Sequence, residues 1–220
     1  MQYNRNLPHI QPPEGTFFVT FMLQGAIPKK IMEQLIADRE RDILLLETQY
    51  KQKISEIPEE QIAQLHQLNE LRYTLQKKYF GKLDNFLDQA SWGISQLRDD
   101  AIAEIVHNAV LWANGKYYRL WASCVMSNHV HLLLTSLPDT SIPALYRILQ
   151  SVKSYSARQA NQALQRSGKF WMRESYDHLV RKDEFYRIQQ YILDNPVKAG
   201  IVSEWQQYRW TYLDPELGNW

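Results

Sequence analysis

The 220-residue sequence has little cysteine, almost no net charge and no long apolar run. Its single cysteine, Cys124, excludes an intrachain disulfide, and the apolar stretch around it predicts a buried thiol. No segment has the length and apolarity of a membrane-spanning helix, and no secretory leader is recognisable, so we expect a cytoplasmic protein without a membrane partner. A chain of this length is predicted to form one domain over residues 1–220, with room for an insertion.

The net charge of +1 lacks the basic excess that is usual in proteins that bind nucleic acids. The charged residues are unevenly distributed along the chain. Residues 31–105 hold 14 acidic and 9 basic side chains, whereas residues 147–210 hold 11 basic and 6 acidic ones. Aromatic residues are interleaved with the basic ones in the second segment. Such a surface suits phosphate contacts and stacking on unpaired bases; a merely solvated face is the alternative explanation.

The most informative motif is His129-Val130-His131, at the head of an apolar run that is typical of a buried strand. Side chains alternate along a strand, so both imidazoles are predicted to point to one face, close enough to share a divalent metal ion. For such a pair alone, two hydrogen-bonded structural histidines are an equally good explanation, because a metal site is identified by its full ligand set.

A second motif combines Tyr191 and Asn195 near the end of a predicted helix over residues 183–194. Residues four apart share one helix face, so a phenol and a carboxamide are presented together. Pro196 disfavours helical geometry at the residue before it, and the helix is therefore expected to stop at Asn195. A tyrosine of the core or its rim is the alternative explanation for Tyr191 alone.

Together these motifs resemble a known family. The segment Met126–Leu134 resembles the "MPNHVHLL" core of the single-tyrosine (Y1) HUH transposases of the IS200/IS605 type, with Ser127 in place of the usual proline. The block Tyr191–Gly200, with Arg181 before it, resembles the "IR…YI..NPVKAG" block of their REP-associated tyrosine transposase relatives, the RAYT branch. In the family's order, the resemblance covers residues 15–28 and 78–210.

The order of predicted elements indicates an α+β fold with a mainly antiparallel sheet covered by helices on one face. The resemblance implies that this fold is of the HUH, ferredoxin-like kind. Residues 117–126 and 129–136 are predicted to pair as a strand hairpin. Residues 30–80 have a helical period amid alternating charges, so we expect an inserted antiparallel helical hairpin there, followed by a loop and short turn from Phe80 to Ala90.

The resemblance implies a metal-dependent endonuclease and transposase that cleaves and rejoins single-stranded DNA through a 5′-phosphotyrosine intermediate. In this reading Tyr191 is the nucleophile, and His129, His131 and Asn195 are the ligands of a Mg²⁺ or Mn²⁺ ion. The chemistry is consistent with those roles, because a tyrosine with its ordinary pKa of about 10 is a weak nucleophile at neutral pH and needs a cation to polarise the phosphate. Rival nucleophiles are Tyr155, Tyr176 and Tyr186.

The expected partner is single-stranded or hairpin DNA, at element ends or repeated palindromes. Basic residues around the tyrosine helix are predicted to contact it: Lys153, Arg158, Arg173, Arg181, Lys182 and Lys198. A monomer is slightly favoured over a homodimer, because the NPVKAG block points to the REP-associated branch, whose members can act as monomers.

Two other functions are alternatives to cleavage. One is a DNA-binding protein of the same fold that no longer cleaves. The presence of all four motif residues argues against it: His129, His131, Tyr191 and Asn195. The other is a two-histidine phosphoesterase, which needs a second H-x-[ST]-type motif that the remaining histidines do not supply.

Overall fold

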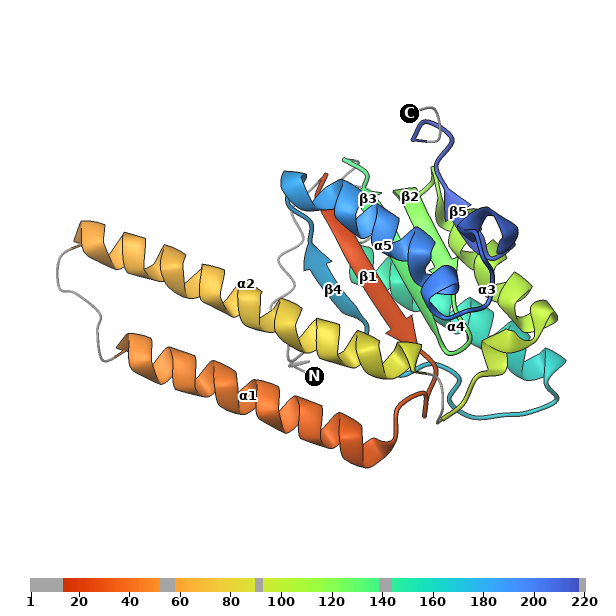
Figure 1. The fold of residues 1–220 in the computed structure, drawn as a ribbon, viewed down its shortest axis with the longest axis horizontal. Coiled ribbons are helices and arrows are strands. Elements are labelled where there is room, and N and C mark those ends of the chain that lie inside the picture. Colours follow the sequence, from red (N-terminus) through yellow and green to blue (C-terminus); the bar gives the residue numbers. More distant parts are fainter. Residues whose placement is uncertain (1–13, 52–57, 90–92, 139–143, 218–220) are drawn as a thin grey trace. The chain divides into compact units, whose positions relative to one another are not determined.

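The computed structural model describes residues 14–51, 58–89, 93–138 and 144–217. The chain forms two compact units (Figure 1). The sheet unit comprises Met1–Ala26 and Ile94–Trp220, and the helical unit comprises Ile27–Gly93. Among the helices in the described ranges, none has both the length and the apolar character that a membrane crossing requires.

The described part of the sheet unit contains one sheet of five strands and three α-helices. The strands are β1 (Thr16–Met22), β2 (Tyr118–Val125), β3 (His129–Ser136), β4 (Tyr176–Leu179) and β5 (Thr211–Leu213), and the helices are α3 (Asp100–Ala113), α4 (Leu145–Ala163) and α5 (Phe185–Lys198). Every pair of neighbouring strands is antiparallel, in the order β4-β1-β3-β2-β5. The α+β prediction is confirmed, and β2 and β3 form the predicted hairpin.

Alternation along β1 and β3 gives the sheet two different faces. One face, which we call the apolar face, is built from large buried pairs: Phe17 with Leu134, Val19 with Leu132 and Phe21 with Val130. On the opposite face, which we call the mixed face, Thr20 is the cross-strand partner of His131, and Phe18 is the partner of Leu133. Polar and apolar side chains therefore lie side by side on the mixed face.

Helices cover both faces, whereas the sequence led us to expect helices on one face only. On the apolar face, the hydroxyl of Tyr118 in β2 donates to the carbonyl of Val110 in α3 at 2.7 Å, and α3 packs against α4. On the mixed face, which α5 covers (Figure 1), Phe185 of α5 packs edge-on against Trp121 of β2. Their ring centroids are 5.5 Å apart. A helix is required on the mixed face as well, because apolar side chains of that face, such as Phe18, are stabilised by burial away from water.

The predicted end of the tyrosine helix is wrong, since α5 continues through Pro196 to Lys198. Two backbone hydrogen bonds close the last turn: Gly200 N–H donates to Val197 O, and Ile201 N–H donates to Pro196 O, each at 2.9 Å. With Gly200 at φ +68°, this is a Schellman motif, which satisfies carbonyls that the helix end leaves open. These bonds hold the last turn helical despite the N–H that proline lacks.

Replacing Gly200 by alanine is expected to lower the free energy of unfolding by about 1–2 kcal/mol, because a side chain at this positive φ is strained. Gly81, inside a helix, is the matched control: Gly81→Ala is expected to raise the free energy of unfolding by up to about 1 kcal/mol. Among the described residues, no atom crowds the Cβ position of either glycine, so the backbone conformation decides the sign. Denaturant unfolding measures both variants, and two changes of the same sign would contradict the assignment.

The helical unit consists of α1 (Lys29–Lys51) and α2 (Pro58–Asp88), which run antiparallel (Figure 1). Their contacts set this direction, because Tyr79 donates to the Asp42 carboxylate at 2.7 Å, while Arg72 pairs with Glu47 further along. Burial and this bond raise the pKa of Tyr79 to about 12. The two helices agree with the hairpin predicted over residues 30–80, whose connection at 52–57 lies outside the described residues.

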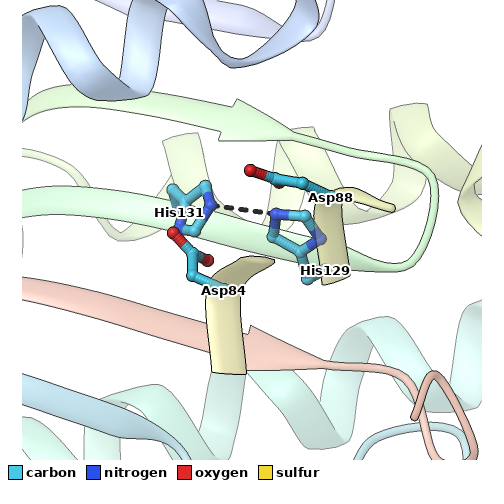
Figure 2. Close-up of side chains that lie close together, drawn as sticks. All are labelled: Asp84, Asp88, His129 and His131. Carbon is cyan, nitrogen blue, oxygen red and sulfur yellow. Dashed lines mark hydrogen bonds between the residues drawn. The ribbon is translucent and has the colours of Figure 1, made fainter. Parts of the chain in front are cut away.

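The loop predicted from Phe80 to Ala90 is wrong, since α2 continues through Gly81 to Asp88. A single glycine costs a helix about 1 kcal/mol, which neighbouring residues offset here. Tyr79, Leu83 and Leu87 stand four residues apart and continue the apolar stripe past the glycine. The last turns of α2 also carry Asp84 and Asp88, both drawn in Figure 2.

Candidate active site

His129 and His131 lie side by side on β3, with their imidazoles on the same face of the strand (Figure 2). Their Nε2 atoms are 2.9 Å apart, and the ring planes are inclined at 72°. One proton bridges the two nitrogens at this distance, so one of them donates and the other accepts. A divalent cation that replaced the bridging proton would receive a lone pair from each ring.

The outer nitrogens of both rings are also hydrogen-bonded. Nδ1 of His131 lies 2.7 Å from the hydroxyl oxygen of Thr20, and Nδ1 of His129 lies 2.6 Å from the carboxamide oxygen of Asn128. Thr20 and Asn128 were not among the site residues predicted from the sequence. The available signals were a polar residue inside the apolar run of β1 and the position of Asn128 directly before the pair. The register of β1 against β3 is what brings Thr20 opposite His131.

Both imidazoles are held in the neutral form. Burial lowers the pKa of His129 to about 3. Burial, and secondarily the neighbouring His129, lower the pKa of His131 well below its ordinary value. The neutral ring is the form that binds a metal ion, so metal binding at neutral pH requires no net loss of a proton from these side chains, only its transfer from Nε2 to Nδ1 of one ring.

The fold is expected to lose stability on acidification from about pH 6.5 downwards. An unfolded histidine titrates near pH 6.5, whereas folded His129 titrates near pH 3, so the unfolded state binds more protons between these values. The free energy of unfolding therefore falls by about 1.4 kcal/mol per pH unit for each histidine that stays neutral. Denaturant unfolding at pH values across this window measures the slope. His129→Gln/His131→Gln is expected to flatten it, and an unchanged slope would refute the assignment.

Tyr191 lies on α5 against the mixed face, next to the histidine pair. Its ring centroid is 5.7 Å from that of His131 and 6.0 Å from that of Phe18. The ammonium of Lys198, two turns further along the same helix, lies 4.7 Å from the centroid of the tyrosine ring. A phenol is thus placed between a candidate metal ligand and a fixed positive charge.

Asn195 follows Tyr191 by one helical turn and is 1% exposed. Its amide nitrogen donates weakly to the Tyr191 carbonyl at 3.4 Å, while its buried Oδ1 has no hydrogen-bond partner among the described residues. Leaving a buried acceptor unsatisfied costs about 1–3 kcal/mol. A carboxamide oxygen together with imidazole nitrogens suits Mn²⁺ or Mg²⁺, so the residues present fit such an ion.

The rival tyrosines occupy other positions. Tyr155 is half exposed on α4, whose neighbour α3 covers the apolar face, and Tyr186 is 65% exposed on α5. Tyr176 lies on β4 as the cross-strand partner of Thr20. Tyr191 is the candidate whose ring packs against a histidine of the pair.

The six basic residues predicted to contact DNA fall into two groups. Arg181 and Lys182 lie just before α5 and Lys198 in its last turn, and all three are exposed. The other group belongs to α4 and the segment after it: Lys153, Arg158 and Arg173. Lys153 is largely buried, because its ammonium donates to the carbonyl of Arg173 and the hydroxyl of Ser175 at 3.0 and 3.1 Å.

Comparison with known proteins points to one family. Residues 95–195 match the family model described as "Transposase IS200 like". A solved structure of a REP-associated tyrosine transposase bound to a REP hairpin has 14% identity and a TM-score of 0.52, over 100% of this chain and 86% of that one. A transposase structure from Deinococcus radiodurans also has 14% identity, with a TM-score of 0.35 over 89% of this chain and 98% of that one. No curated protein matches the sequence significantly.

Proposed function

We propose that this chain, whose residues 95–195 match the IS200-like transposase family model, cleaves and rejoins single-stranded DNA with Tyr191 as the nucleophile. The family resemblance seen in the sequence is confirmed, and the fold is that of a REP-associated tyrosine transposase. Family and fold support a transposase role that involves DNA. The observation that carries the finer proposal is the packing of Tyr191 against His131, because it joins the two sequence motifs in one site.

In the proposed reaction, Oη of Tyr191 attacks a phosphorus of the DNA backbone and loses its proton. The bond from phosphorus to the 3′ oxygen breaks, and this leaving oxygen takes up one proton for the one that the phenol gives up, which leaves a 5′-phosphotyrosine and a free 3′-OH. Attack of a 3′-OH on the phosphotyrosine reverses these steps and rejoins the strand. Lys198, close to the tyrosine ring, stabilises negative charge as it develops on the phenol and the phosphate.

His129, His131 and Asn195 are the residues that would hold a divalent Mg²⁺ or Mn²⁺ ion in this site. When bound, such an ion supplies Lewis-acid polarisation of the phosphate. The facing Nε2 atoms of the histidines and the buried Oδ1 of Asn195 support this ligand set. A catalytic metal, unlike a structural one, keeps a position for water or substrate, and a set of three protein ligands would allow this.

We propose a hairpin in single-stranded DNA as the substrate, because the related transposase of the same fold was solved with a REP hairpin. The exposed cations at the two ends of the tyrosine helix, Arg181, Lys182 and Lys198, are the first candidates for phosphate contacts. Arg158 and Arg173, on and after α4, are proposed to make separate phosphate contacts on the α4 side of the sheet. Lys153 is proposed to order this segment through its bonds to Arg173 and Ser175.

Neutralising two of these cations tests that surface. Arg181→Gln/Lys182→Gln is expected to weaken hairpin binding and to reduce the slope of log affinity against log salt by about 1.4–1.8, because each lost phosphate contact removes about 0.7–0.9 from the slope. Fluorescence anisotropy across a salt series measures both quantities. Lys29→Gln/Lys30→Gln, an exposed pair on α1, is the control with equal charge loss. Equal slopes in the two double variants would remove Arg181 and Lys182 from the interface.

Covalent capture tests cleavage itself. The protein is incubated with Mn²⁺ and a hairpin-containing single strand from its own genomic flanks, labelled at the 3′ end or at the 5′ end. We expect a denaturant-resistant adduct that carries the 3′ label, a released 5′-labelled fragment, and loss of both in EDTA. An adduct carrying the 5′ label would contradict the proposed polarity. Tight hairpin binding without any adduct would favour the alternative, a DNA-binding protein that no longer cleaves.

A further inference from the structure

We infer that Thr20 and Asn128 are positioning residues that hold the rings of His131 and His129 with both Nε2 atoms directed at one metal ion. The inference rests on the proposed metal site and concerns its supporting hydrogen bonds. Both side chains are buried, at 0% and 1% exposure, and each bonds the outer nitrogen of one imidazole. Partners of this kind fix the tautomer and orientation of metal-binding histidines.

Asn128 determines the tautomer of His129. A carboxamide oxygen accepts hydrogen bonds and never donates, so Nδ1 of His129 carries the proton in their 2.6 Å bond. Its Nε2 then presents a lone pair toward the site as long as the ring is neutral. The backbone of this turn is itself anchored, because the Asn128 carbonyl accepts from Leu23 N–H at 2.9 Å and the His129 carbonyl accepts from Met126 N–H at 2.8 Å.

Thr20 lets His131 exist as either tautomer. Since Nε2 of His129 presents its lone pair, the proton between the two rings resides on Nε2 of His131, and the Thr20 hydroxyl donates to Nδ1 of His131. With a metal ion on Nε2, neutral His131 carries its proton on Nδ1 instead. A hydroxyl that rotates can then accept that proton, because it is both a donor and an acceptor. A methyl group at this position would remove this hydrogen bond in both states.

Mn²⁺ affinity, measured by the EPR signal of free Mn²⁺, tests these roles without requiring DNA cleavage. Thr20→Val and Asn128→Ala are each expected to weaken binding about 10–100-fold. Thr20→Ser keeps the hydroxyl and is expected to bind within about threefold of the wild type. Thr16→Val is the matched control, because Thr16 lies on the same face of β1 and its hydroxyl bonds Thr135 at 2.8 Å, away from the histidines.

Nitrogen-15 NMR of the imidazoles gives a second readout. It is made on the wild-type protein and therefore does not depend on how well a variant folds. In the metal-free wild type, His129 is expected as the Nδ1–H tautomer and His131 as the Nε2–H tautomer. The opposite assignment would overturn the inference, as would a Thr16→Val effect as large as that of Thr20→Val. Unchanged affinity in Thr20→Val and Asn128→Ala, beside a wild type that binds Mn²⁺, would overturn the positioning role alone. A wild type that binds no Mn²⁺ would overturn the proposed metal site and this role with it.

Discussion

Replacing Tyr191 by phenylalanine is expected to abolish the covalent protein–DNA adduct, with a loss of more than about 1000-fold in the rate of its formation. The substitution removes the oxygen that would bond to phosphorus. It keeps the ring, and with it the packing against His131 and Phe18. The hairpin affinity is therefore expected to change by less than about 1 kcal/mol, as anisotropy would show. A loss of chemistry with binding retained is the signature of a nucleophile.

Tyr186→Phe is the matched control, because this residue lies on the same helix and its side chain is exposed. We expect the control to form the adduct at the wild-type rate. An adduct that persists in Tyr191→Phe would move the nucleophile to Tyr155, Tyr176 or Tyr186. Phenylalanine variants of these three would then identify which one bonds to DNA.

Replacing Asn195 by leucine is expected to separate stability from activity. The substitution removes a buried Oδ1 that has no partner among the described residues and puts an apolar side chain of similar size in its place. The free energy of unfolding in metal-free buffer is therefore expected to rise by about 1 kcal/mol. Adduct formation with Mn²⁺ is expected to fall by more than about 100-fold, because a proposed ligand is lost. Denaturant unfolding and covalent capture measure the two effects on the same preparations.

Two further variants make this test specific. Asn195→Asp restores an oxygen ligand and is expected to recover adduct formation with Mn²⁺. Gln189→Leu removes another buried carboxamide oxygen of α5 that has no partner among the described residues, but that has no proposed role. We expect it to leave the adduct unchanged. If Asn195→Leu lowered stability, or formed the adduct as fast as Gln189→Leu, Asn195 would not be a metal ligand.

The local parts of the fold were predictable because their signals lie within a few residues of one another. The apolar run that begins at His129 predicted a strand, and the alternation of side chains along a strand placed both histidines on one face. The four-residue spacing of Tyr191 and Asn195 predicted a shared helix face. The wrong predictions also came from local rules, in which a proline or a glycine ends a helix, and neighbouring residues outweighed those rules. Pro196 did not end α5, because the Schellman motif at Gly200 stabilises the last turn, and Gly81 did not end α2, because the apolar stripe continues past it.

The sequence by itself determined which residues are candidates, since residue type and spacing carry the chemistry of imidazole, phenol and carboxamide. The tertiary structure alone decided how they meet. Pairing of β1 with β3 brings Thr20 opposite His131 across more than a hundred residues, and docking of α5 on the mixed face brings Tyr191 to the pair. Burial then keeps both histidines neutral. Register, docking and desolvation depend on contacts between distant segments, which no local pattern in the chain encodes.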